Sequence, residues 1–330
     1  MNVAVSQSLY EYYRGRDHKQ VSVTDFAKFV TPHPLKPIAD KLWEIYGDLE
    51  DFANGVLMIV HQMRYELTVP AKYPVETIVE NVGDCDLFSY VAASIMKAGG
   101  LNVVLLYYPS EAHMNVGVHL PSAPQHARFP VRYVTYNDVR YYIAECTGGN
   151  WAMGWRVGEC PEELWRAECQ VISLENCEEW APGQVSASYK TLQFSAISLF
   201  PSSYFGIQGS TVILRGQISP KLSGKSITIY FKVGDSTWNV MAVTETDSEG
   251  RFSLTWVAEE AGVYQFRASW SGDDNYAGAD SQTINIIIIS TFFLILFLGI
   301  VILICLGVII FLKSTQKHRG TQELELPRIP

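Results

Sequence analysis

The sequence of 330 residues lacks an excess of basic side chains. It carries 25 Lys and Arg against 34 Asp and Glu, which gives a formal net charge of −9. Because a protein that binds nucleic acid in general needs a basic face for the phosphates, that class is not expected. The sequence also contains no phosphate-binding loop, no dinucleotide-binding fingerprint and no Asn-x-Ser/Thr acceptor for N-glycans.

The six cysteines lack the spacing of a zinc site. Four of them lie within 32 residues, at intervals of 14, 9 and 8 residues: Cys146, Cys160, Cys169 and Cys177. These intervals match no zinc pattern, so neither a metal nor a cofactor is predicted. Outside the cell the four could form up to two disulfides, and they fit equally well as free thiols.

One long apolar run lies near the C-terminus. Residues 286–312 are almost wholly apolar, and at 1.5 Å per residue they span about 40 Å, enough to cross a hydrocarbon core of about 30 Å. Lys313, Lys317 and Arg319 follow this run directly. The positive-inside rule therefore predicts a membrane helix at 284–312, a cytoplasmic tail at 313–330 and the rest of the chain outside the cell.

An outward orientation requires an export signal, and the first residues do not contain one. Residues 1–28 are polar and aromatic, without the apolar run of roughly 7–15 residues that a signal peptide needs. Either the true start lies further upstream, or the chain inserts as a tail-anchored protein with its bulk inside the cell. The first alternative is favoured.

Residues 190–283 form short alternating runs separated by turn residues. Strands are predicted at 211–218, 226–233, 238–246, 251–257, 262–270 and from 281 onward. Strands of this length and spacing favour an antiparallel sandwich. The stretches 246–252, 261–264 and 268–278 resemble the Ig-like repeats of prokaryotic surface proteins, which usually act as spacers or adhesive units.

A cysteine begins the second of two predicted helical regions. Residues 38–68 carry apolar side chains at three- and four-residue spacing, and the same pattern returns after Cys85. Asp84 suits the N-cap of that helix and Gly99 the C-cap. Free N–H groups at a helix start stabilise a thiolate and can donate to an oxyanion, so Cys85 is either a nucleophile or a buried structural cysteine.

Two other residue types of a thiol enzyme lie at strand ends. His113 begins the predicted strand 113–119 and shares a face with Asn115, while Glu145 ends a strand at 139–145. A thiol, an imidazole and a carboxylate can serve as nucleophile, base and orienting group. Because Asp84 and Asp86 flank Cys85, a cation is expected nearby.

Four motifs together carry a family resemblance: GDCD at 83–86, AGGL at 98–101, HMNVGV at 113–118 and YYIAECT at 141–147. In this order they look like the transglutaminase-like (papain-like cysteine) superfamily. The chain most resembles the branch found in prokaryotic, especially archaeal, surface proteins. The likeness covers about residues 38–165.

The resemblance implies roles for individual residues. The nucleophile falls on Cys85, the base on His113 and the third member on Glu145, where the superfamily often has Asp. An upstream Gln is the oxyanion donor of papain-like enzymes, which makes Gln62 a candidate for that role. The residues expected at the substrate cleft are Asp84, Asp86, Asn115, Trp151 and Trp155, the two tryptophans being alternatively a cover for the core.

The expected organisation is an extension at 1–37, an α+β papain-like domain at 38–189, an all-β Ig-like sandwich at 190–283, one transmembrane helix and a short basic tail. The expected function is thiol acyl transfer, as a cysteine peptidase or amidohydrolase acting on protein or peptide amides outside the cell. The alternatives are a cross-linking transglutaminase with the same triad and a non-catalytic surface binding or adhesion module. Membrane lipid around 284–312 is the other expected partner, and the oligomeric state stays open.

Overall fold

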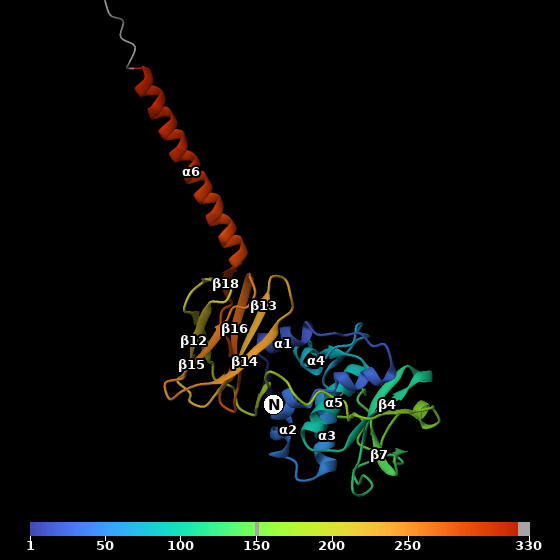
Figure 1. Cartoon of the computed structure of the whole chain (residues 1–330). Helices are drawn as coiled ribbons and strands as arrows, with labels where there is room; N and C mark the ends of the chain where they lie inside the picture. Colours follow the sequence, from blue (N-terminus) through green and yellow to red (C-terminus); the bar gives the residue numbers. More distant parts are fainter. Residues whose placement is uncertain (149–151, 323–330) are drawn as a thin grey trace, which may run out of the picture.

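The computed structural model describes residues 1–148 and 152–322. It mixes helix and sheet in two parts, followed by one long helix, α6 (Thr291–Gln322). An α+β part extends from β1 (Asn2–Ala4) to β9 (Ser186–Ser188), and a β part follows it up to Ile289. Figure 1 shows the β part between the α+β part and α6.

In its described residues, the α+β part contains five α-helices, with α5 at its centre. They are α1 (Gln7–Arg14), α2 (Pro32–Trp43), α3 (Leu49–Val60), α4 (Pro74–Glu80) and α5 (Cys85–Ala98), with 3-10 turns at Val23–Phe29, Pro109–Glu111 and Glu162–Trp165. The prediction of helix over 38–68 is wrong in its extent, because residues 44–48 separate two helices and the second ends at Val60. Asp48 starts that second helix by accepting the N–H of Asp51.

A five-stranded sheet lies against α5. Its order is β6 (Tyr133–Tyr136), β7 (Val139–Ala144), β5 (His113–Val118), β4 (Val103–Tyr108) and β8 (Gln170–Ile172), with all neighbours antiparallel. A short parallel pair, β2 (Arg64–Tyr65) and β3 (Val82–Gly83), leads into α5. Because α5 is apolar around most of its circumference, its residues 87–96 are buried between the helices and the sheet.

The N-terminal segment 1–37, predicted as an extension, belongs to the same core. Its strand β1 pairs with β9, almost 190 residues further along the chain. Leu9, Tyr13 and Phe29 are fully buried among the core residues of α2 to α5. No break in packing therefore marks the predicted boundary at residue 37 in the described part of the chain.

The β part contains two sheets around one core. Its strands are β10 (Ala196–Pro201), β11 (Phe205–Ile207), β12 (Thr211–Ser219), β13 (Ser226–Val233), β14 (Asn239–Glu245), β15 (Arg251–Val257), β16 (Gly262–Gly272), β17 (Ala277–Asp280) and β18 (Ile284–Ile289). One sheet has the order β10-β12-β15, and the other has the order β11-β18-β16-β13-β14 with β17 beside β16. Apolar side chains of both sheets share the core, as the alternating pattern predicts.

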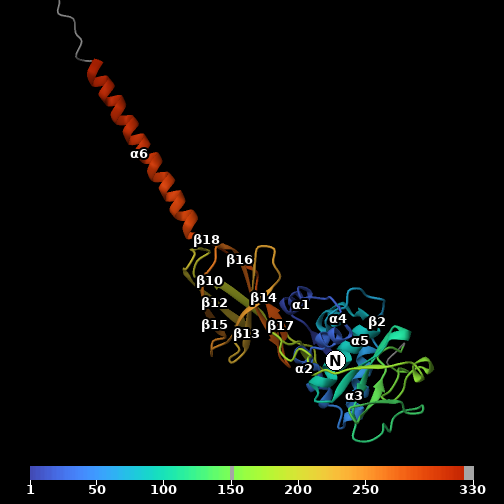
Figure 2. The ribbon, with the colours of Figure 1, turned by 45° about the vertical axis from the view of Figure 1, so that its right-hand side comes forward.

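The helix α1 lies between the two parts in both views of the molecule (Figures 1 and 2). The rings of Tyr12 and Tyr230 are 6.2 Å apart. Nη1 of Arg267 lies 2.8 Å from Oε2 of Glu11, and the Thr228 hydroxyl donates to the carbonyl of Pro182. The same face of β13 and β16 therefore carries the contact with the α+β part.

Among the described residues, one helix is long and apolar enough to cross a membrane. It is the stretch Thr291–Lys313 of α6, 23 residues long with a mean hydropathy of 3.4 and no burial inside the protein. Length and composition fit a single-pass anchor, because apolar side chains without protein cover are stable in lipid. The predicted helix start at residue 284 is wrong, because residues 284–289 form β18 and belong to the sandwich predicted to end at 283.

The core makes a direct prediction about stability. Phe52 is completely buried, with its ring 4.3 Å from that of Trp43. Phe52→Ala should lower the free energy of unfolding by about 3–5 kcal/mol, because it leaves a cavity. Ile45→Ala is the control, since that side chain is 59% exposed, and it should change the value by less than about 0.5 kcal/mol. Denaturant unfolding followed by circular dichroism measures both, and equal effects would contradict the assigned core.

Candidate active site

Cys85 is the first residue of α5 and is held there by the preceding loop. Asp84 is the N-cap residue, but its Oδ2 accepts the N–H of Thr68 at 2.8 Å instead of capping its own helix. A Cβ at Gly83 would lie only 2.9 Å from Cβ of Leu87, so this close approach needs glycine. The first-turn N–H of Leu87 donates to Oδ1 of Asp86 at 3.0 Å, so the backbone N–H of Cys85 itself is the first-turn donor that remains available beside its half-buried thiol.

His113 brings a ring to this thiol from the start of β5. Its Nε2 lies 2.9 Å from Oε2 of Glu145, and the ring also interacts with Cys85, which leaves Nδ1 for the sulfur. Sγ of Cys85 is 3.8 Å from the carbonyl oxygen of Ala112, the residue before His113. The structure thus places Cys85, His113 and Glu145 next to one another, from a helix start and two strand ends.

Glu145 follows β7 and is fully buried. Besides His113, its carboxylate accepts the side-chain N–H of Asn115 at 3.1 Å. It also accepts the backbone N–H of Thr147 at 2.9 Å and the Thr147 hydroxyl at 2.6 Å. Burial alone would raise the pKa of Glu145, but the hydrogen bond and charge of His113 and the bonds of Thr147 hold it below its usual value. The group is therefore an ionised carboxylate.

His113 is a cation at neutral pH in this environment. Burial acts to lower its pKa, but hydrogen bonds with Cys85 and Glu145 and the Glu145 charge raise it to about 10. A histidine is ordinarily half protonated near pH 6.5. The cation expected beside Cys85 is therefore His113 itself.

Asp86, one of the two aspartates beside Cys85, lies in an environment that disfavours its charged form. Burial, and then the hydrogen bond and charge of Asp84, raise the pKa of Asp86 far above its ordinary value. Two close carboxylates in a desolvated place favour sharing a proton. The negative charge that opposes a thiolate at Cys85 is correspondingly smaller than the sequence suggests.

His61 is a neighbour of the triad that sequence reasoning missed. It is buried at the end of α3, and its Nε2 lies 3.0 Å from the backbone oxygen of Glu145. Burial lowers the pKa of His61, so the neutral ring donates from Nε2 to that carbonyl. The bond fixes the main chain of Glu145, and no local sequence signal marks a contact across 84 residues.

Cys85 and His113 open onto a cavity of about 490 Å³. Its walls are Asp84 and Asp86, residues 65–71 of the loop before α4, Tyr107 and Ala112 beside the β4–β5 turn, and His18, Lys19, Gln20 and Phe26 of the N-terminal segment. The 65–71 loop and the N-terminal segment were not anticipated as walls. A substrate segment that enters this cavity reaches the thiol directly.

The other predicted cleft residues lie elsewhere. Gln62 is exposed, and its amide donates to the carbonyl of Met58 at 2.7 Å within its own helix end, so it does not line the cavity. Asn115 is buried behind His113 as a partner of Glu145. Trp155 packs beside Gly148 and Phe129, away from the cavity. Trp151 lies outside the described residues.

All six cysteines are free thiols in the structure, which describes each of them. Cys146, beside Glu145, is fully buried and contacts the carbonyl of Ala144 instead of a second sulfur. Burial raises the pKa of both Cys160 and Cys169 to about 11. Disulfides among the four clustered cysteines are therefore not formed here. Arg132 acts on Cys160 and Lys97 acts on Cys177, but burial outweighs these charges and raises the pKa of both thiols.

The chain has no match among models of known protein families, and no curated protein sequence matches it. The fold and the site define a chain of mixed helix and sheet with a Cys–His–Glu cluster beside an open cavity. A long apolar helix completes it.

The raised pKa of His113 predicts a pH dependence of stability. A histidine with a raised folded pKa contributes stability that is complete below pH 6.5, its unfolded value, and is lost as the pH approaches about 10. The difference in unfolding free energy between wild type and His113→Ala should therefore shrink by about 4 kcal/mol from pH 6 to pH 10. Chemical denaturation at several pH values measures it.

Ile45→Ala serves as the control for that series, since this 59% exposed side chain has no titratable group. Its difference from wild type should stay flat over the same range. A flat difference for His113→Ala as well would contradict the ionic pair with Glu145.

Proposed function

We propose that this chain is a membrane-anchored thiol acyl-transfer enzyme of the transglutaminase-like, papain-like kind, acting as a peptidase or amidohydrolase. The observation that carries the proposal is the position of His113, which lines the same cavity as Cys85 while its Nε2 lies 2.9 Å from the buried Glu145 carboxylate. Sγ of Cys85 lies 3.8 Å from the carbonyl oxygen of Ala112, the residue before His113. A nucleophile, a base and an orienting carboxylate have the mutual geometry that thiol catalysis requires. Their position on the wall of an open cavity gives a substrate access.

The first chemical step follows from the charges of these groups. The Cys85 sulfur attacks an amide carbonyl carbon and forms a C–S bond, while His113 carries the proton that the thiol has given up. As the C–N bond breaks, His113 donates this proton to the leaving amine, and an acyl-enzyme remains. Water then releases an acid, whereas an amine would give the transamidation of a transglutaminase.

The developing oxyanion needs donors near Cys85. Since Gln62 lies away from the cavity and the N–H of Leu87 donates to Asp86, the backbone N–H of Cys85 at the start of α5 is the donor that this proposal assigns. The positive end of the helix dipole adds to its effect. A protonated Asp86 beside this position carries no negative charge, so it does not repel the developing oxyanion.

Hydrolysis is favoured over transamidation. Leu67 and Val69 on the cavity wall are 81% and 94% exposed, so solvent reaches the rim freely. The superfamily outside animals is also mostly peptidase-like. In this proposal the β part resembles an Ig-like spacer, α6 crosses the membrane, and the two N-terminal parts lie outside the cell with the tail 313–330 inside.

Alkylation tests the pair at Cys85 directly. In the full chain in detergent, iodoacetamide at pH 6 should modify Cys85 about 10-fold faster in wild type than in His113→Ala, because the cation favours the reactive thiolate form. Peptide mass spectrometry resolves each cysteine. Cys169 is an internal control, since it is half-buried without a cationic partner, and should react equally slowly in both proteins. Equal rates at Cys85 would remove the main support for an enzyme and favour a surface-binding module.

Substrate turnover tests the third residue. Glu145→Gln keeps the size of the side chain but removes its charge, so kcat for cleavage of labelled casein should fall by about 10²- to 10⁴-fold with little change in KM. Cys85→Ala should abolish cleavage, and Cys169→Ser should leave it unchanged. Incorporation of a fluorescent amine into casein instead of cleavage would identify the transglutaminase alternative.

A further inference from the structure

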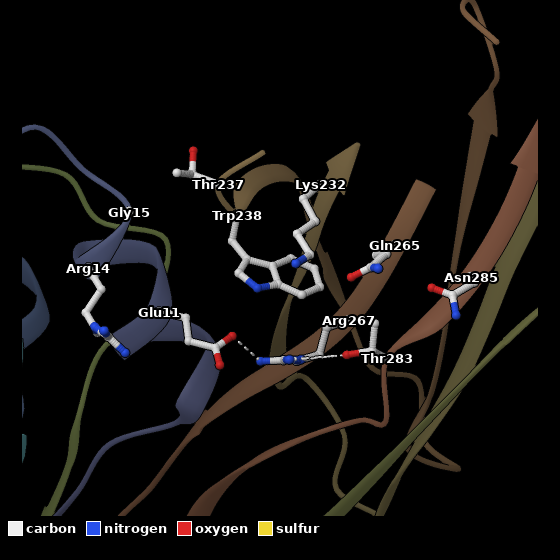
Figure 3. Close-up of a pocket in the computed structure, with 10 residues that line it drawn as sticks. All are labelled: Glu11, Arg14, Gly15, Lys232, Thr237, Trp238, Gln265, Arg267, Thr283 and Asn285. Atoms are coloured by element: carbon white, nitrogen blue, oxygen red, sulfur yellow. Dashed lines mark hydrogen bonds and ion pairs between the residues drawn. The ribbon is translucent and has the colours of Figure 1, made fainter. Parts of the chain in front are cut away.

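One face of the six-stranded sheet of the β part changes from polar to apolar side chains along its strands. Nearest to α1, Tyr230 and Arg267 pair in register and contact the α+β part. The next row in register is Lys232, Gln265 and Asn285. Figure 3 shows these three polar side chains on the wall of an open cavity of about 540 Å³. This cavity is solvated and polar.

Beyond that row, towards α6, the same face becomes apolar. Ile287 pairs with Val263 of β16 and with Phe205 of β11, and Ile289 pairs with Ile207. Since residues in register share a face and alternate residues point the same way, these five lie on the face of Asn285. All five are between 39% and 65% exposed, whereas the intervening Ile286 and Ile288 are buried in the core. We call Phe205, Ile207, Val263, Ile287 and Ile289 the sheet-end patch.

The patch is continuous with the apolar surface of α6. Ser290 alone separates Ile289 from Thr291, the first residue of α6. At about 3.3 Å per residue, the two apolar rows lie about 7 and 13 Å before the helix start, and the polar row lies about 20 Å before it. Polar side chains, apolar side chains and a lipid-soluble helix thus follow one another in the order that a membrane surface imposes.

The thickness of the headgroup layer accommodates both apolar rows if the strands are inclined towards the membrane surface. The headgroup layer on each side of the hydrocarbon is about 5–8 Å thick, so strands inclined towards the surface bring both apolar rows into it. The 23-residue stretch Thr291–Lys313 of α6 makes about 35 Å of helix, longer than the hydrocarbon core, so a tilt is expected for the anchor as well.

We infer that the sheet-end patch lies in the headgroup region of the bilayer, so that the β part leans on the membrane through this face. The inference rests on the proposed membrane anchor and is independent of the chemistry at Cys85. Because α1 packs on the same face, the lean also carries the α+β part towards the lipid surface. Phe205 and Ile207 contribute although they precede α6 by more than 80 residues.

A photoreactive phenylalanine analogue tests the contact with little change of side chain. We would place benzoylphenylalanine separately at Phe205, at Phe293 in α6 and at Phe194, which are 65%, 65% and 96% exposed. The full chain is reconstituted in phosphatidylcholine nanodiscs and illuminated, and mass spectrometry counts lipid adducts. Position 205 should give about 10-fold more lipid adduct than position 194, although position 194 is the more exposed.

The other outcomes each overturn the inference in a different way. Lipid adduct at 293 without adduct at 205 would leave the anchor in place and show that the patch is free of lipid. A chain-to-chain adduct at 205 would show that a second copy covers the patch. Absence of lipid adduct at both 205 and 293 would remove the anchor itself, while the alkylation of Cys85 would still test the enzyme separately.

Discussion

A carboxylate removed from water costs several kcal/mol unless a positive charge and hydrogen-bond donors surround it. Glu145 has no exposed surface, and its oxygens receive bonds from His113, Asn115 and Thr147 while its main chain is held by His61. Loss of one of these partners leaves a buried charge without compensation. The ends of β5, β7 and α3 are consequently tied to one point, and the protonated His113 that faces Cys85 is a result of the same requirement.

The N-terminal segment links this site to the rest of the molecule. Its helix α1 contacts the β part through Tyr12 and Glu11, and residues 18–20 and Phe26 of the same segment line the cavity of Cys85. Docking of the β part and the shape of the cavity therefore depend on one stretch of chain. A substitution at the β-part contact can therefore change the shape of the cavity, and the reverse, because both ends of the segment pack into the same core.

The parts of this structure that could be predicted from the sequence are those set by local patterns. The residue pattern locates the start of α5 at Cys85, although the Asp84 side chain bonds Thr68 instead of capping the helix. Period-two alternation locates the strand that His113 begins and six strands of the β part, but not β10, β11 and β17. The break between α2 and α3 was missed because the apolar spacing continues across it. The positions of Gln62, His61 and the N-terminal segment depend on packing between distant residues, which periodicity does not encode.

The joint between β18 and α6 is a single residue, Ser290. A flexible tether of many residues lets an enzyme explore a volume whose radius grows with the square root of its length. A one-residue joint removes that freedom, so in the proposed membrane-anchored form the β part stays at a nearly constant height above the bilayer. The encounters of the proposed enzyme then depend on lateral diffusion in two dimensions, and substrates held at the same height meet it far more often than substrates dissolved in bulk.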